Sequence, residues 1–356
     1  MKKILSLVMT SVLAVGVLAG CGTKAPVTPV ETKTETPVET KVETPVVEEK
    51  GAIAKMGLGI VTTIDKSKDY AEEKAVGQVD SVIVAAGFDK DGKIVTVTID
   101  TAQSKVEFAK DMVLKTDVAV AGKTKIELGN DYGMKGTSTL GKEWFEQIAE
   151  LEKYMVGKTV AEVKAMKLTD TTVPDVEELK SLVTIKVSGY IAALEKAYAN
   201  ASEVKGAVKV GLGHGISLSK SKSMEGETMA VAQVDTTIVA TALSADGKVA
   251  GTIIDTAQTK VSFDKDGKIT NDLKAVVKSK VELGADYGMK GSSGIGKEWF
   301  EQAKALADWT VGKTPADVTG LKVTDGKADV AELKTSVTVS VGGYIAAFTE
   351  AASKAR

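Results

Sequence analysis

Apolar and polar residues alternate along two stretches of the chain in the pattern typical of β-strands. The stretches are residues 79–84 and 94–100, and the segment Lys-Asp-Gly-Lys at 90–93 separates them. Because Asp-Gly between β-branched runs favours a tight turn, the pattern predicts an antiparallel hairpin. A shorter strand is predicted at 105–108, which extends the hairpin to a meander. The same elements recur later, at residues 234–240, 249–255 and 260–263.

A helical pattern follows the first meander. Large apolar residues recur every three or four positions, which predicts an amphipathic helix that ends near Gly157. These residues are Leu140, Trp144, Ile148, Leu151 and Met155. Thr159 with Glu162 forms a capping-box pattern, and its later counterpart begins with Thr314 and has Pro315 at the first helical position. A further helix is therefore predicted to start at each threonine.

One apolar stretch fits two kinds of element. Val183, Ile185 and Val187 alternate as in a strand, but the apolar run that follows, 190–194, fits a helix. The counterparts in the later stretch are Val337, Val339 and Val341. The pattern leaves open whether a strand precedes the helix or whether the stretch is one continuous helix.

The chain contains a tandem duplication. Residues 127–147 recur at 282–302 with four differences, 155 positions later. A hydrophobic core requires only apolar periodicity, so identity retained at Gly, Lys, Asp, Ser and Glu indicates a shared backbone conformation or a shared ligand site. The sequence therefore predicts an α+β fold with two tandem domains, at residues 51–203 and 204–356. Each is expected to be an antiparallel β meander followed by helices.

The N-terminus has the features of an export signal. Lys2 and Lys3 precede the apolar run 4–17, which is too short to span a bilayer. The run leads into Leu-Ala-Gly-Cys at 18–21, which resembles a bacterial lipobox. This resemblance implies cleavage of residues 1–20, a lipid on the sulfur of Cys21, and anchoring at the extracytoplasmic face of the cell membrane. Since Cys21 is the only cysteine, no disulfide can form within the chain.

Residues 21–50 have a different composition from the rest of the chain. They consist mainly of Thr, Pro, Val, Glu and Lys and hold four of the six prolines. Because such a segment has too few large apolar side chains to bury, it is predicted to be an extended, disordered stalk behind the lipidated cysteine.

Charge and histidine content exclude several classes of function. Without residues 1–20 the chain has 44 basic and 48 acidic residues, a net charge of −4, which argues against a nucleic-acid partner. His214 is the sole histidine, and Ile60 stands at the corresponding position of the first repeat. His214 is therefore interpreted as a local substitution. A His-based zinc site and a Ser-His-Asp triad are therefore excluded, and no metal site is predicted.

The glycine-rich segment 136–142 leads into the predicted amphipathic helix, and 291–297 repeats it. Small residues, hydroxyls, backbone amides at a helix start and a lysine are typical of an anion site. Both segments match the front of a Walker A loop, but Glu143 and Glu298 replace its Mg-binding hydroxyl, so a nucleotidase is excluded. The glycines alone would also permit a tight turn into the helix. Both interpretations remain open.

The candidate ligand residues lie around these segments. They are Asp131, Tyr132, Thr137, Ser138 and Lys142 in the first repeat, and Asp286, Tyr287, Ser292, Ser293 and Lys297 in the second. Tyr132 and Trp144 could cover a flat heterocycle, although Trp144 also fits core packing. A second retained set either caps a turn or presents a ligand face. Its members are Asp100, Gln103 and Lys105, with Asp255, Gln258 and Lys260.

The order of these motifs resembles a known family. A strand pair around Asp-Gly-Lys-Ile, then Glu-Leu-Gly, then Asp with Ser or Thr six residues later is similar to the extracytoplasmic FMN-binding domain. That family includes the C subunit of sodium-pumping NADH:quinone reductase and two-domain flavinylated lipoproteins. In it a flavin transferase joins the FMN phosphate to a Thr or Ser hydroxyl. The resemblance implies Thr137 and Ser292 as acceptors, with Ser138 and Ser293 as the alternatives, while residues 134–136 depart from the family pattern.

The leading hypothesis is therefore a cell-surface lipoprotein that binds one FMN in each repeat. It would carry electrons from a membrane quinone or NADH dehydrogenase to extracellular acceptors, and it is expected not to be an enzyme itself. The alternative is a non-redox surface lipoprotein that binds a peptide, a glycan or a cell-wall polymer.

Overall fold

The computed structural model describes residues 52–356, so the predicted signal peptide, Cys21 and the stalk lie outside the described residues. Both repeats belong to one compact unit, Glu48–Arg356. The first repeat contains β1 (Ile53–Thr63), β2 (Lys68–Ala71), β3 (Lys74–Phe88), β4 (Ile94–Phe108), α1 (Lys125–Leu128), the 3-10 turn η1 (Gly129–Tyr132), α2 (Trp144–Met155), α3 (Val160–Lys164) and α4 (Ser188–Ala199). The second contains β5 (Ser202–Ser217), β6 (Ala230–Ser244), β7 (Val249–Phe263), α5 (Lys280–Leu283), η2 (Gly284–Tyr287), η3 (Lys290–Ser292), α6 (Trp299–Thr310), α7 (Pro315–Thr319), β8 (Val323–Thr324), β9 (Lys327–Ala328) and α8 (Gly342–Ser353).

The predicted hairpins are present in both repeats. Strands β3 and β4 pair antiparallel from Ala75–Phe108 to Phe88–Ile94, and β6 pairs with β7 in the same way. Gly92 and Gly247 have φ values of 76° and 78°, as the Asp-Gly turns require. The α+β prediction is therefore confirmed. The separate strands predicted at 105–108 and 260–263 are wrong, because no turn interrupts β4 or β7 before Phe108 and Phe263.

The long strands β1 and β5 were not predicted, and neither were the short strands β2, β8 and β9. Strand β1 pairs with β3, β5 pairs with β6, and the starts of β1 and β5 pair with each other at Ile53–Ala207 and Met56–Ser202. This contact joins the two meanders into one seven-stranded antiparallel sheet. Both strands are interrupted by glycines at alternate positions, which removes the apolar alternation that identifies a strand in a sequence.

These glycines bring a helix onto each strand. A Cβ atom on Gly59 of β1 would lie 1.9 Å from the carbonyl oxygen of Ala193 in α4. A Cβ on Gly213 of β5 would lie 2.0 Å from the carbonyl oxygen of Ala347 in α8. Only a residue without a side chain allows the helix backbone to pack this closely on a strand.

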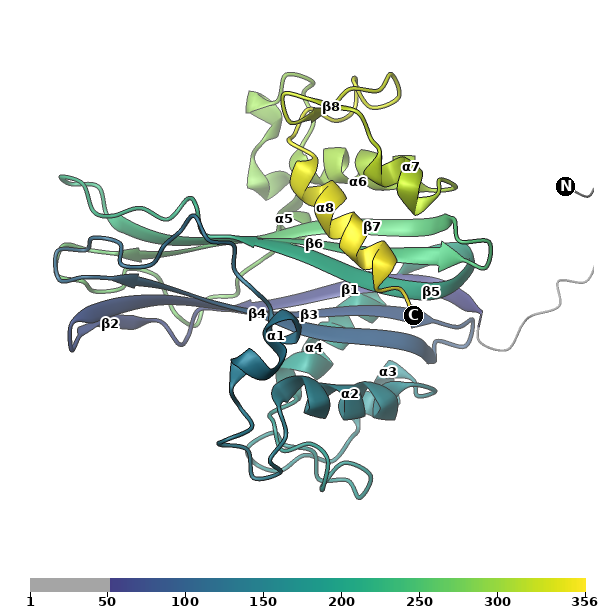
Figure 1. The fold of residues 1–356 in the computed structure, drawn as a ribbon, viewed down its shortest axis with the longest axis horizontal. Helices are drawn as coiled ribbons and strands as arrows, with labels where there is room; N and C mark the ends of the chain where they lie inside the picture. The colour runs from purple at the N-terminus through teal and green to yellow at the C-terminus, as the bar shows by residue number, and fades with distance from the viewer. Residues whose placement is uncertain (1–51) are drawn as a thin grey trace, which may run out of the picture. The chain divides into compact units, whose positions relative to one another are not determined.

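Four layers follow from this packing, with helices outside and sheet inside (Figure 1). Helices α2, α3 and α4 cover the outer face of the first meander, and α6, α7 and α8 cover that of the second. The inner faces of the two meanders pack against each other in a shared core, in which the rings of Phe108 and Phe263 lie 5.2 Å apart. Each repeat therefore supplies one half of a hydrophobic core.

The helix predictions agree with the structure in most respects. Helix α2 coincides with the predicted amphipathic stretch but begins at Trp144, and both predicted capping boxes, at Thr159 and Thr314, are formed. The ambiguous stretch forms no strand. Val183 and Val187 of this stretch are buried in the core of the first repeat, and helix α4 begins at Ser188.

Candidate functional site

The glycine-rich loop predicted to bind an anion already holds a carboxylate of the protein. Glu143 is 3% exposed and accepts hydrogen bonds from the backbone amides of Met134 and Lys135, both at 2.9 Å. Glu298 accepts the matching amides in the second repeat at 2.8 and 3.0 Å. The carboxylate at the N-terminus of the helix thus occupies two of the donors that a phosphate would need.

The predicted hydroxyl acceptors lie beside this loop. Thr137 and Ser292 are exposed, and their hydroxyls donate to the carbonyl oxygens of Met134 and Met289 at 3.1 and 3.0 Å. The hydroxyls of Ser138 and Ser293 are tied to the following helix, since each accepts a hydrogen bond from a glutamine side chain, of Gln147 and Gln302 respectively. Asp131 and Asp286 are exposed, and Lys142 and Lys297 are half-buried.

The aromatic rings that were candidates for covering a heterocycle contact a lysine of the protein. The ammonium of Lys125 lies 4.7 Å from the ring centre of Tyr132 and 5.2 Å from that of Trp144. Lys280 repeats this arrangement in the second repeat. Trp144 is 2% exposed and donates to the Tyr190 hydroxyl at 2.8 Å, which favours core packing as its role.

The retained Asp-Gln-Lys set is divided between the two faces of the sheet. The side chain of Gln103 accepts a hydrogen bond from the Tyr132 hydroxyl at 3.4 Å, and Lys105 is exposed. Asp100 is buried and accepts the backbone amides of Thr101 at 2.7 Å and Ile126 at 3.2 Å. In the second repeat Gln258 binds Tyr287, Asp255 accepts the amides of Thr256 and Val281, and Lys260 is exposed. For the aspartates this geometry favours the turn-capping interpretation.

A cavity of about 450 Å³ lies between the two repeats, and sequence reasoning did not identify it. Its walls are mainly apolar, and its polar groups come from both repeats. Strand β4 contributes Thr98 and Asp100; the region of α1 and α2 contributes Ile126, Gly129, Phe145, Ile148, Ala149 and Glu152; the second repeat contributes Leu212, His214, Lys354 and Arg356.

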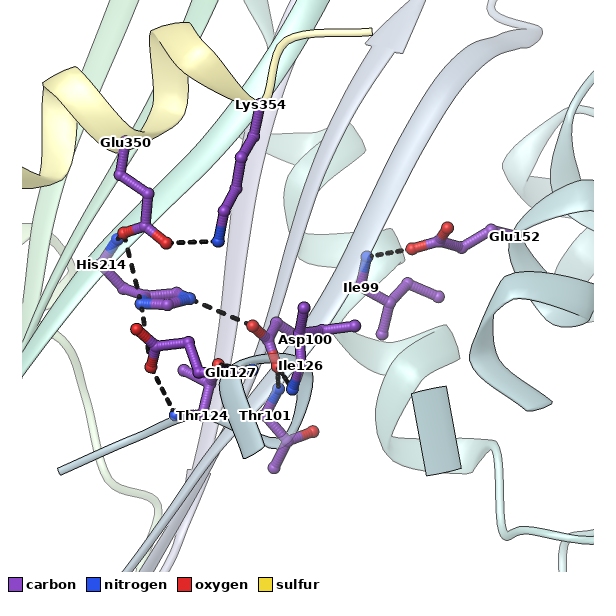
Figure 2. Close-up of polar contacts among 10 residues, drawn as sticks. All are labelled: Ile99, Asp100, Thr101, Thr124, Ile126, Glu127, Glu152, His214, Glu350 and Lys354. Atoms are coloured by element: carbon purple, nitrogen blue, oxygen red, sulfur yellow. Dashed lines mark hydrogen bonds and ion pairs between the residues drawn. The ribbon is translucent and has the colours of Figure 1, made fainter. Parts of the chain in front are cut away.

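His214 and Asp100 meet at the wall of this cavity (Figure 2). The side chain of His214 is 2% exposed, and its Nε2 atom lies 3.1 Å from Oδ2 of Asp100. Its Nδ1 atom lies 3.6 Å from a carboxylate oxygen of Glu350 and 3.8 Å from one of Glu127. Burial lowers the pKa of His214, but the hydrogen bond to Asp100 and the nearby carboxylates outweigh burial and raise the pKa above its ordinary value.

A second charged pair crosses between the repeats. Glu152 of α2 accepts the backbone amide of Ile99 at 2.7 Å and forms an ion pair with Arg356, which also donates to the carbonyl oxygen of Val97 at 3.1 Å. Burial raises the pKa of Glu152, and Arg356 opposes this shift. Arg356 thereby ties the second repeat to the first.

A corresponding but different pocket of about 300 Å³ also lies between the repeats, lined by Ile60 of the first and Asp255 of the second. Ile60 stands where the cavity has His214. Lys196 stands where it has Glu350, pairs with Glu282 and donates to the carbonyl oxygen of Ile60 at 2.9 Å. Burial raises the pKa of Asp255 to about 6. Aligning the two repeats in the sequence reveals both differences, His214 against Ile60 and Glu350 against Lys196. Nothing in the sequence indicates that His214 and Glu350 lie side by side.

Comparison with known proteins gives one partial similarity. The chain is 35% identical over 124 residues to a protein named chlorophenol reductase from Desulfitobacterium hafniense. The match covers 32% of this chain and 38% of the relative's length. No family model matches the chain. No solved structure matches it either.

The similarity corrects one expectation. The relative has the name of a redox enzyme, which contradicts the expectation that this protein is not an enzyme. Among residues 52–356, no helix combines the length and the apolar character needed to cross a membrane.

Proposed function

We propose that the protein is a reductase that binds a small, mainly apolar aromatic compound in the cavity between the repeats. The cavity carries this proposal, because its volume of about 450 Å³ falls within the range of small-molecule sites. The name of the partial relative supports reduction as the reaction class and a phenol as the substrate class.

The cavity supplies two kinds of contact for such a compound. Phe145, Ile148 and Leu212 offer apolar surface to an aromatic ring. Asp100 and Arg356 provide an acceptor and donors for a phenolic hydroxyl or phenolate. Because these groups come from both repeats, neither repeat alone would provide the site.

Filling the cavity is expected to weaken binding. In Ala149→Leu the larger side chain would extend from α2 into the space for the ring, so the affinity for 2-chlorophenol should fall by about tenfold or more. Calorimetric titration of the full chain measures this affinity. The control is Ala305→Leu, which makes the same change on α6 at a half-buried position that does not line the cavity. Equal affinities for the two variants would contradict the assignment.

We propose FMN as the redox cofactor, joined through its phosphate to Thr137 and Ser292: a flavin transferase would transfer the FMN-phosphoryl group from FAD to each hydroxyl, breaking the FAD pyrophosphate bond and releasing AMP and the hydroxyl proton. Thr137 and Ser292 are exposed, so their hydroxyls are accessible for ester formation. Non-covalent binding of the phosphate by the loop is less well supported, because Glu143 already occupies two of its backbone amides. Bound FMN would supply one- and two-electron chemistry. The chain made with a flavin transferase is expected to gain up to two FMN-phosphoryl units in its intact mass, and Thr137→Ala and Ser292→Ala should each remove one. An unchanged mass would overturn this cofactor assignment.

We further propose that the protein is anchored through a lipid on Cys21 at the extracytoplasmic face of the membrane. A membrane quinone or NADH dehydrogenase would then be its electron donor. The apolar run 4–17 before the lipobox-like residues 18–21 supports this location.

A further inference from the structure

Three possible metal ligands converge beside the cavity. Ligand atoms of Glu127, His214 and Glu350 all lie within 4.8 Å of one another. They come from α1, β5 and α8, and Figure 2 shows the two glutamates directed toward the imidazole ring. The site thus combines one imidazole with two carboxylates from both repeats, a donor set that suits first-row divalent metals.

The imidazole is oriented as a metal-binding histidine usually is. Oδ1 of Asp100 accepts the amides of Thr101 and Ile126, which fixes the carboxylate, and Oδ2 faces Nε2 of His214 at 3.1 Å. Since a carboxylate accepts, Nε2 bears a hydrogen, and a metal ion bound at Nδ1 would take the place of any proton held there. Protein metal sites commonly use such a carboxylate to hold the ligating histidine.

The two glutamates are held in place by the backbone. Oε2 of Glu127 accepts the amide of Thr124 at 2.7 Å, and Oε2 of Glu350 accepts the amide of His214 at 2.8 Å. These oxygens lie 3.8 and 3.6 Å from Nδ1. Two atoms bound to one tetrahedral zinc ion lie about 3.4 Å apart, so a small movement would bring all three to bonding distance.

The corresponding pocket has a positive charge at this position. There the ammonium of Lys196 lies against Glu282, the counterpart of Glu127. In the cavity Glu350 occupies the position that corresponds to Lys196, so a carboxylate replaces an ammonium group. Asp100, Glu127 and Glu350 with Lys354, the partner of Glu350, sum to a charge of −2 when His214 is neutral. A divalent cation balances this charge.

We infer that Nδ1 of His214 and the carboxylates of Glu127 and Glu350 bind one divalent transition metal ion, for which Zn²⁺ is the probe. Asp100 is the positioning residue that holds His214. The inference does not depend on the proposed reductase function, because it rests on the two pockets alone.

Zinc binding by the full chain tests the inference. The protein, purified without a histidine tag and freed of metal by a chelator, should bind one equivalent of Zn²⁺ by calorimetry. Since His214 is the sole histidine, its imidazole NMR signals are unambiguous and should shift with saturation at one equivalent. Signals that do not move at one equivalent, or heat that does not saturate, would overturn the inference.

Matched variants use the protein's own second pocket as the template. The double change His214→Ile with Glu350→Lys copies the arrangement of Ile60 and Lys196 and should weaken Zn²⁺ binding by about a hundredfold or more. Asp100→Asn should weaken it by about ten- to a hundredfold. Circular dichroism checks that each variant is folded, and Glu350→Gln replaces the double change if it is not. Wild-type affinity in the folded double variant or in Glu350→Gln would contradict the site.

The reverse exchange tests for gain of binding. Ile60→His with Lys196→Glu introduces the same ligands beside Asp255 and Glu282 and should raise the stoichiometry from one Zn²⁺ to two. A folded variant that still binds one ion would show that His, Glu and Glu at these positions do not suffice, which would contradict the ligand assignment.

Discussion

Replacing Gly213 by alanine is expected to destabilise the protein by about 3 to 5 kcal/mol, at the upper end for a single methyl group. The added Cβ would lie 2.0 Å from the carbonyl oxygen of Ala347 and 2.6 Å from the amide nitrogen of Ala351. Both atoms belong to the backbone of α8, so no side chain can rotate away and the helix itself must move. That movement would also displace Glu350 and Lys354 from the cavity region.

The control lies two residues along the same strand. A Cβ on Gly215 would meet no atom within 4 Å, so Gly215→Ala should change the free energy of unfolding by less than about 1 kcal/mol. Urea denaturation of the two variants measures both values. If Gly213→Ala and Gly215→Ala have equal midpoints, α8 does not pack on β5 as described.

Separating the repeats is expected to abolish the monomeric fold of each half. Residues 51–203 alone would expose the inner face of the first meander, with Met56, Ile83 and Phe108, all of which are fully buried in the whole protein. Isolated soluble domains rarely tolerate an apolar surface of this kind. Each half should therefore aggregate or self-associate, and the two halves should recover a 1:1 complex when expressed together.

Analytical ultracentrifugation with circular dichroism distinguishes the outcomes. The expected result is that residues 51–203 or 204–356 alone give no folded monomer, whereas the pair sediments as one folded species. A stable monomer of either half would show that the repeats are independent domains, as the duplicated sequence by itself suggests.

Local signals in the sequence were sufficient for much of the fold. The Asp-Gly turns, the capping boxes at Thr159 and Thr314, and the apolar stripe of α2 each act over a few residues, so they could be predicted. Strands β1 and β5 could not be predicted. Their glycines are required because the backbones of α4 and α8 pack against them. The contacting helix residues are more than 130 positions away in the chain.

The retained polar segment has an explanation that the sequence did not provide. Glu143 binds the amides of Met134 and Lys135, and Ser138 accepts from Gln147, so the segment satisfies its own polar groups. The second repeat makes the same bonds. Because these hydrogen bonds depend on particular side chains, the same residues are needed in both repeats. Their identity therefore does not by itself indicate a ligand.

The cavity between the repeats depended on tertiary contacts. His214 and Asp100 stand 114 positions apart, and no periodic pattern connects them. The sequence favours a local substitution at His214, because its counterpart is Ile60. In the structure this difference between the copies is the feature that distinguishes the cavity from the corresponding pocket, since Glu350 also replaces Lys196 there.

The reductase assignment is tested most sharply by the consumption of 2-chlorophenol by the purified, flavin-loaded full chain with reduced methyl viologen as the electron donor. Catalytic turnover is expected for the wild-type protein and for Ala305→Leu, and its loss is expected in Ala149→Leu, which fills the cavity. Wild-type turnover in a folded Ala149→Leu variant, or no turnover by any of the three proteins, would contradict the assignment of the cavity between the repeats as the substrate site of a reductase.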